Sequence, residues 1–197
     1  MTDKHPSFWD NMYTEGRTGW DRGASSPQLL AWLDNNALTP GSIIVPGCGN
    51  GYEVLTLSAA GFDVTGLDIA PTAVNHLRTQ IEQHDLIAEV LQENILEWQP
   101  PRWVDAIYEQ TSLCALNPEH WPQYEQQLHS WLKPQGKLFA LWMQTSKEGG
   151  PPYHCEIPDI KKLFSDSHWK WSKQENRVEH PAGMVELAYI LEKRSEI

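Results

Sequence analysis

A glycine-rich turn that follows a buried strand constrains this chain more than any other stretch of its sequence. Residues 42–46 read Ser-Ile-Ile-Val-Pro, a run apolar enough for a strand covered on both faces, as in a parallel sheet. Gly47, Gly49 and Gly51 follow, and glycines there allow a positive φ and keep side chains away from a ligand that presses on the backbone. We expect a helix over residues 52–60, whose first N–H groups point into the same space.

A second strand, residues 62–68, ends on the carboxylate of Asp68. About 20 residues separate this carboxylate from the glycines, the spacing at which an acidic side chain meets the two hydroxyls of a ribose. The glycines are spaced G-x-G-x-G, with Tyr52 next, and not G-x-G-x-x-G as in dinucleotide sites. A ligand with a ribose and no pyrophosphate fits better, and S-adenosylmethionine is the commonest cofactor of that kind. These residues therefore predict a nucleoside-binding βαβ unit.

Helical and strand-like segments alternate along the rest of the chain. Helices are expected over residues 71–84, 118–132 and 157–164, and strands over residues 88–92, 103–108 and 137–143. Segments 169–175 and 185–193 are expected to form a closing antiparallel pair. The pattern is typical of an α/β fold with a doubly wound, mostly parallel sheet.

The topology of such a sheet brings distant residues together. Right-handed crossovers place the carboxyl ends of parallel strands at one edge, where open α/β sheets bind their ligands. We therefore expect Gly47, Asp68, Asn94, Glu109 and the loop 149–153 to meet in one cleft. Asn94 and its neighbour Ile95 follow the third strand and are placed to contact a base.

Residues 1–40 precede the first strand and are expected to form a cap over the site. They hold a helical turn at residues 8–13, a loop with three glycines at residues 14–23, and a helix opened by Ser26 and Pro27. Residues 41–197 would form the sheet core, so that the whole chain, 1–197, is expected to be a single domain.

Composition excludes several classes of protein. The net charge of −11 repels phosphate backbones, so nucleic acid is not an expected partner. The three cysteines form no C-x-x-C pair and there is no H-E-x-x-H, so neither a disulfide framework nor a metal site is expected. No apolar run approaches the length of a membrane span, so no membrane is expected and the cytoplasm is the expected location. The sequence does not indicate an oligomeric state. Four tryptophans are expected in the core: Trp98, Trp103, Trp131 and Trp142.

Several motifs resemble the thiopurine S-methyltransferase superfamily, above all its branch of halide and thiol methyltransferases and their bacterial relatives. The similar stretches are Trp9-Asp10, Gly19-Trp20-Asp21 and residues 45–49, 66–69, 111–116, 132–136 and 149–153. The resemblance implies the seven-stranded sheet of class I methyltransferases with an N-terminal helical cap. It implies S-adenosylmethionine as the cofactor and a small soft nucleophile, such as a thiol, thiopurine, halide or reduced chalcogen, as the methyl acceptor.

The resemblance also assigns residues to the cofactor. Those residues are Trp9, Tyr13 and Trp20 in the lid, Gly47, Cys48 and Gly49 at the methionine part, Asp68 with Ile69 at the ribose, Asn94 and Ile95 at the adenine, and Glu109 and Gln110 at the methionine end. Trp20, Arg17 and Tyr153 are candidates for contact with the acceptor. The Glu109–Gln110 pair stands where relatives carry an Asp–Tyr pair, Tyr13 where the halide and thiol branch tends to have Trp, and Asn94 where Asp is frequent; these departures bear on the acceptor more than on the cofactor.

Methyl transfer from a sulfonium is an in-line displacement with a neutral leaving group. The protein supplies alignment, which is potentially worth ~7–11 kcal/mol, and excludes water. A thiol is already a few per cent ionised near neutrality, so a dedicated base is optional. If a base acts, Glu109 and His154 are the candidates.

Two other functions stay open at this level. A nicotinamide-dependent oxidoreductase could use a similar sheet, although the glycine spacing argues against it. A cofactor-binding regulatory domain without turnover is the other alternative, because the Glu109–Gln110 pair departs from the pattern of the relatives.

Overall fold

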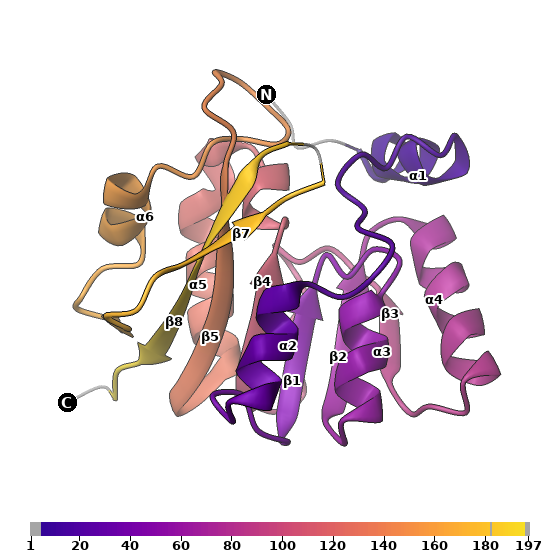
Figure 1. Cartoon of the computed structure of the whole chain (residues 1–197), viewed down its shortest axis with the longest axis horizontal. Coiled ribbons are helices and arrows are strands. Elements are labelled where there is room, and N and C mark those ends of the chain that lie inside the picture. Colours follow the sequence, from indigo (N-terminus) through magenta and orange to yellow (C-terminus); the bar gives the residue numbers. More distant parts are fainter. Residues whose placement is uncertain (1–4, 182, 196–197) are drawn as a thin grey trace. The chain divides into compact units, whose positions relative to one another are not determined.

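The computed structural model of the chain describes residues 5–181 and 183–195. The fold divides after Trp98 into an N-terminal unit, residues 1–98, and a C-terminal unit, residues 99–197. Figure 1 shows helices and strands in both units, and the predicted α/β class is confirmed. No helix in the described ranges has both the length and the apolar character required to cross a bilayer.

The N-terminal unit contains a three-stranded parallel sheet. Its strands are β1 (Ser42–Pro46), β2 (Asp63–Asp68) and β3 (Glu89–Gln92), with β2 in the middle. Helices α3 (Tyr52–Ala59) and α4 (Pro71–Gln83) connect them. The strands and helices lie within a few residues of their predicted bounds, because apolar runs, proline starts and glycine turns are local signals.

Two further helices precede the first strand. Helix α1 spans Pro6–Thr14 and helix α2 spans Pro27–Asp34. The hydroxyl of Ser26 accepts a hydrogen bond from the backbone N–H of Gln28 at 3.3 Å, as an N-cap residue does. Helix α2 ends at Asp34, and Asn36 just beyond it adopts a left-handed conformation with φ of 58°.

The C-terminal unit is built around strand β5 (Leu132–Gln144), which pairs with a strand on each side. Strand β4 (Val104–Gln110) runs parallel to β5, and β5 pairs antiparallel with β8 (Val185–Lys193), beside which it lies in Figure 1. The short 3-10 helices η1 (Leu113–Ala115) and η2 (Pro118–His120) and helix α5 (Trp121–Trp131) connect β4 to β5, and helix α6 (Ile157–Leu163) follows β5.

The closing pair contains one strand more than predicted. Strand β6 (Trp169–Trp171) and strand β7 (Asn176–Glu179) both pair antiparallel with β8, where a single strand over residues 169–175 was expected. Ser172 lies at the interruption, and its hydroxyl accepts the backbone N–H of Ile190 at 3.2 Å in place of a backbone carbonyl. The described residues thus hold eight strands. The count exceeds the predicted seven because the edge strand expected beside β8 is interrupted and forms two short strands.

Large aromatic side chains fill the core of the C-terminal unit. Trp131 and Trp142 are fully buried, as predicted, and so is Trp169. The prediction is wrong for Trp103, which is 59% exposed, and Trp98 is only half-buried. Trp103 lies just before β4, where its ring centroid is 6.0 Å from the ammonium of Lys193. A cation over an aromatic face stabilises such an exposed position.

Candidate cofactor and acceptor site

The glycine turn has the backbone conformation that the sequence predicts. The φ angles of Gly47, Gly49 and Gly51 are 57°, 52° and 79°, all in the left-handed region. The backbone N–H of Cys48 donates to the carbonyl of Leu67 at 2.8 Å, which ties the turn to the end of β2. The turn therefore lies beside the carboxyl end of the neighbouring strand, where Asp68 stands.

Two of these glycines are required for different reasons. A Cβ atom on Gly49 would lie 2.8 Å from the hydroxyl oxygen of Tyr13, a residue of the cap. A Cβ atom on Gly51 would lie 2.2 Å from a methyl carbon of Leu77 in helix α4. Gly49 thus leaves space on the side of the cap, whereas Gly51 allows α4 to pack closely.

Asp68 is held by backbone groups at the tip of β2. It is 7% exposed, and its two carboxylate oxygens accept hydrogen bonds from the N–H groups of Gly49 at 2.8 Å and Ala70 at 2.9 Å. Burial raises the pKa of this carboxyl, and the backbone N–H groups of Ala70, Gly49 and Ile69 oppose that rise. A carboxylate has about four lone-pair positions, so it can still accept a further donor such as a ribose hydroxyl. The geometry fits the ribose of a nucleoside.

The cap places three aromatic rings close to the glycine turn. The ring of Trp20 meets those of Trp9 and Tyr13 edge to face, with centroids 5.8 Å apart in both pairs. Burial and the nearby charge of Asp68 raise the pKa of Tyr13, so its phenol stays protonated. Aromatic faces attract cations, and a sulfonium is a cation.

Acidic side chains attach the cap to the rest of the N-terminal unit. Asp10 accepts the backbone N–H of Thr72 at 2.8 Å, at the start of α4. Asp21 accepts a short hydrogen bond from the side-chain amide of Asn50, within the glycine turn. Asp21 belongs to the motif Gly19-Trp20-Asp21, but the sequence alone predicts no role for it. Its position directly after Trp20 in a glycine-rich loop is the signal that could have found it.

The residues expected at the adenine follow β3. The backbone N–H of Glu93 donates to the carbonyl of Asp68 at 3.0 Å, which ties the ends of β2 and β3 together. The side-chain oxygen of Asn94 accepts the N–H of Leu96 at 3.1 Å and holds a turn. Asn94 and Ile95 are half-buried, as is Ile69. These residues share one sheet edge with Asp68.

Glu109 is a buried acid at the end of β4 in the C-terminal unit. It is 1% exposed, and one carboxylate oxygen accepts the N–H groups of Ser112 at 3.1 Å and Leu113 at 2.8 Å. Burial raises the pKa of Glu109 to about 8, and the charge of Glu186 adds to the rise. The raised pKa favours the protonated form of Glu109 near neutral pH, and the side chain holds the first turn of η1.

Gln110 is oriented by two side chains. Its amide nitrogen lies 3.1 Å and 3.0 Å from the two carboxylate oxygens of Glu186, and its amide oxygen accepts the hydroxyl of Tyr108 at 2.8 Å. Glu186 is fully buried on β8, 76 residues away in sequence. Sequence reasoning missed Glu186. An acid inside the apolar run of β8 was the signal that could have found it.

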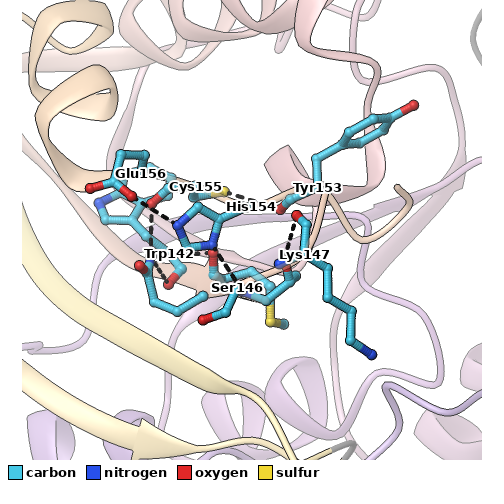
Figure 2. Close-up of polar contacts among 10 residues, drawn as sticks. Trp142, Ser146, Lys147, Tyr153, His154, Cys155 and Glu156 are labelled. Atoms are coloured by element: carbon cyan, nitrogen blue, oxygen red, sulfur yellow. Dashed lines mark hydrogen bonds and ion pairs between the residues drawn. The ribbon is translucent and has the colours of Figure 1, made fainter. Parts of the chain in front are cut away.

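The loop between β5 and α6 carries Tyr153 and His154. The backbone N–H of Tyr153 donates to the carbonyl of Cys114 at 2.7 Å, and Tyr153 is half-buried. Figure 2 shows the imidazole of His154 between Glu156 and the chain at Ser146. Both ring nitrogens of His154 therefore have partners within its own unit.

Arg17 is exposed, whereas the three cysteines are buried. Arg17 pairs with Glu15 at 2.6 Å on the exposed surface of the cap. Cys48, Cys114 and Cys155 are free and buried, and burial raises the pKa of each thiol, so that all three stay protonated. Within the described ranges, no three His, Cys, Asp or Glu side chains are grouped to hold a metal ion.

Each unit thus assembles its own part of the predicted site. The N-terminal unit brings together the glycine turn, Asp68 and the cap aromatics, and the C-terminal unit holds Glu109, Gln110 and the Tyr153 loop. The meeting of the two sets in one cleft stays a prediction, as does the single domain over residues 1–197.

Two plant methyltransferases are similar to this chain in sequence. A probable thiol methyltransferase 2 of Arabidopsis thaliana is 30% identical over 167 residues, which cover 83% of this chain and 74% of the relative. Thiocyanate methyltransferase 1 of Brassica oleracea is 31% identical over 162 residues, 79% of this chain and 70% of the relative.

The similarity extends to three-dimensional structure. The 1,6-didemethyltoxoflavin-N1-methyltransferase of Burkholderia thailandensis, solved with S-adenosylhomocysteine, superposes with a TM-score of 0.79 at 19% identity. The match covers 96% of this chain and 87% of that one, so the two share a fold. The sequence pattern of the family described as Thiopurine S-methyltransferase (TPMT) matches residues 4–185. This chain therefore belongs to the thiopurine S-methyltransferase family and is an S-adenosylmethionine-dependent methyltransferase.

Proposed function

We propose that the enzyme transfers a methyl group to a small soft nucleophile, such as a thiol, thiopurine, halide or reduced chalcogen, by in-line displacement. The observation that carries the proposal is the anchored carboxylate of Asp68 beside the glycine turn, with the cap aromatics close to it. The thiol and thiocyanate methyltransferases to which the chain is similar support this class of acceptor.

The cofactor would be held mainly by the N-terminal unit. Asp68 would bind the ribose with Ile69 beside it, Asn94 and Ile95 would contact the adenine, and the turn from Gly47 to Gly49 would lie along the methionine part. When bound, the cofactor supplies an electrophilic methyl group on a sulfonium. Trp9, Tyr13 and Trp20 would cover it and exclude water, which strengthens the electrostatic interactions inside the site.

The acceptor side requires alignment more than proton transfer. A thiol acceptor already supplies some thiolate near neutrality, so the protein need not deprotonate it. Glu109 is neutral below a pKa of about 8, which supports a role in holding the tip of β4 at neutral pH and a basic role only above that pH. Arg17, Trp20, Gln110 and Tyr153 remain the proposed contacts for the acceptor and the methionine end.

The direct test is a panel of acceptors assayed by formation of S-adenosylhomocysteine. We expect turnover with small thiols and with thiocyanate or iodide, and little with phenols or primary amines of similar size. Faster turnover of the oxygen or nitrogen acceptors would contradict the proposed acceptor class. The Asp68→Ala variant is the control, since the substitution lies in the N-terminal unit and should weaken cofactor binding.

We also propose a cytoplasmic location. The three buried cysteines are all free, which suits a reducing compartment. Fractionation of the source cell would test this proposal, and recovery of the protein in a secreted or membrane fraction would contradict it.

A further inference from the structure

His154 lies at the point where the loop after β5 returns to its own start. Its Nδ1 atom accepts the backbone N–H of Thr145 at 3.0 Å and is 3.3 Å from the backbone nitrogen of Ser146. Its Nε2 atom lies 3.0 Å from a carboxylate oxygen of Glu156 (Figure 2). One nitrogen must therefore accept and the other must donate.

This arrangement fits only one form of the imidazole. Two N–H donors at Nδ1 require a bare lone pair there, and the carboxylate at Nε2 requires a proton. The neutral tautomer protonated at Nε2 satisfies every partner. A lone pair already engaged by two donors is poorly placed to take a proton from an acceptor.

The chain is shaped to present these donors to the ring. Ser146 adopts a left-handed conformation with φ of 53°, which is unfavourable for a residue with a side chain. Successive N–H groups in such a turn can converge on one acceptor, and here the acceptor is Nδ1 of His154. The strained turn and the imidazole therefore support each other.

Neighbouring contacts also join the two ends of the loop, residues 143–145 and 154–156, which we call its neck. The backbone N–H of Cys155 donates to the carbonyl of Met143 at 2.8 Å, and the side-chain amide of Gln144 donates to the carbonyl of Cys155 at 2.7 Å. Residues 146–150 beyond the neck are exposed, whereas Thr145 and Cys155 at the neck are buried. Tyr153 stands immediately before His154, so its place depends on how the neck is closed.

We propose that His154, neutral and protonated at Nε2, is a positioning residue that closes the neck of the loop 145–153 and thereby places Tyr153 for the acceptor. The role of Tyr153 rests on the proposed function, whereas the closure of the neck rests on the contacts of His154 alone. In this role His154 does not act as the general base that the sequence allows.

Two substitutions separate positioning from proton transfer. In His154→Asn the side-chain oxygen can reach the place of Nδ1 and accept the same two N–H groups. In His154→Gln the amide reaches the place of Nε2 instead and leaves those N–H groups without their acceptor. We expect His154→Gln to raise the KM for a thiol acceptor about tenfold, as the loss of one well-placed hydrogen bond would. The KM of His154→Asn should stay within about threefold of the parent value.

Three measurements on these variants test the inference. Binding of S-adenosylhomocysteine should be unchanged in both, and kcat should change less than KM. Trypsin should cut after Lys147, in the exposed part of the loop, faster in His154→Gln than in the parent or in His154→Asn. Nitrogen NMR of the parent should show an unprotonated Nδ1 and a protonated Nε2.

Each contrary result overturns a defined part. Equal loss of kcat in both variants would indicate that His154 acts as a base. Unchanged trypsin cleavage in His154→Gln would show that His154 does not close the neck of the loop. A parent spectrum with the proton on Nδ1 would also overturn the inference. If the parent neither binds S-adenosylhomocysteine nor methylates any acceptor, the proposed function fails, and the trypsin and NMR measurements still decide the role of His154.

Discussion

Asp68 and Glu186, two buried carboxylates in different units, are held in different ways. Asp68 in the N-terminal unit receives backbone N–H groups from Gly49 and Ala70, both within 19 residues in sequence. Glu186 in the C-terminal unit receives the side-chain amide of Gln110 from 76 residues away. A carboxylate held by the backbone depends on the shape of a turn, whereas one held by a side chain depends on which residue stands at a distant position. Both kinds of support occur in the C-terminal unit, because Glu109 there accepts backbone N–H groups as Asp68 does. We infer that the place of Asp68 depends on backbone conformation, whereas that of the Glu186–Gln110 pair depends on residue identity.

The largest effect is expected where the glycine turn meets α4. In Gly51→Ala the new methyl group would lie 2.2 Å from Leu77 and would sit on a left-handed backbone. We expect a loss of about 2–5 kcal/mol in the free energy of unfolding, from strain plus overpacking, measured by urea denaturation. Gly61→Ala is the matched control, because its φ is 86° and nothing lies near its Cβ position, so only about 1–2 kcal/mol should be lost. Equal losses in the two variants would show that packing against Leu77 does not matter.

The second test concerns Asp68 itself. Asp68→Ala should weaken binding of S-adenosylhomocysteine about 10- to 100-fold, because hydrogen bonds to a charged group are worth roughly 1.5–3 kcal/mol. Isothermal titration measures the dissociation constant. Asp63→Asn, at the exposed start of the same strand, is the control and should bind as the parent does. An unchanged constant in Asp68→Ala would refute the ribose assignment.

Glu109 should make the free energy of unfolding depend on pH. Its pKa is raised from 4.5 to about 8 in the folded state, so the unfolded chain binds fewer protons between these values. The contribution of Glu109 to stability is therefore complete below about pH 4.5 and is lost as pH rises to about 8. Glu109→Gln removes this titration and should flatten the fall in stability by up to ~1.4 kcal/mol per pH unit over that range. Parallel stability profiles for parent and variant would contradict the neutral state of Glu109.

The smallest effect is expected at Arg17. Its ion pair with Glu15 is exposed, so Arg17→Ala should change the free energy of unfolding by less than about 0.5 kcal/mol. If Arg17 attracts an anionic acceptor, the KM for thiocyanate should rise a few-fold, about the loss of one screened charge, while the KM for a neutral thiol stays constant. If Arg17→Ala leaves the KM for thiocyanate as it is in the parent, Arg17 does not belong to the acceptor site.

Sequence reasoning is most accurate where the signal is local. The strand at 42–46, the left-handed glycines and the proline that opens α4 are all found where predicted, because each depends on a few neighbouring residues. It fails at Trp103, whose burial depends on what packs against it, and at the interruption at Ser172, whose hydroxyl replaces a backbone partner in an edge strand. It also ascribed the small size of Gly51 to a ligand, whereas Leu77 of α4 occupies that space.

By itself, the sequence determined the glycine turn, the carboxylate at the end of β2 and the family to which both belong, since these reside in short stretches with fixed spacing. Only the tertiary structure decided that burial raises the pKa of Glu109, that Glu186 orients Gln110 and that both ring nitrogens of His154 have partners. Protonation and orientation depend on burial and on partners contributed by other elements of the fold, and no local pattern in the sequence records either.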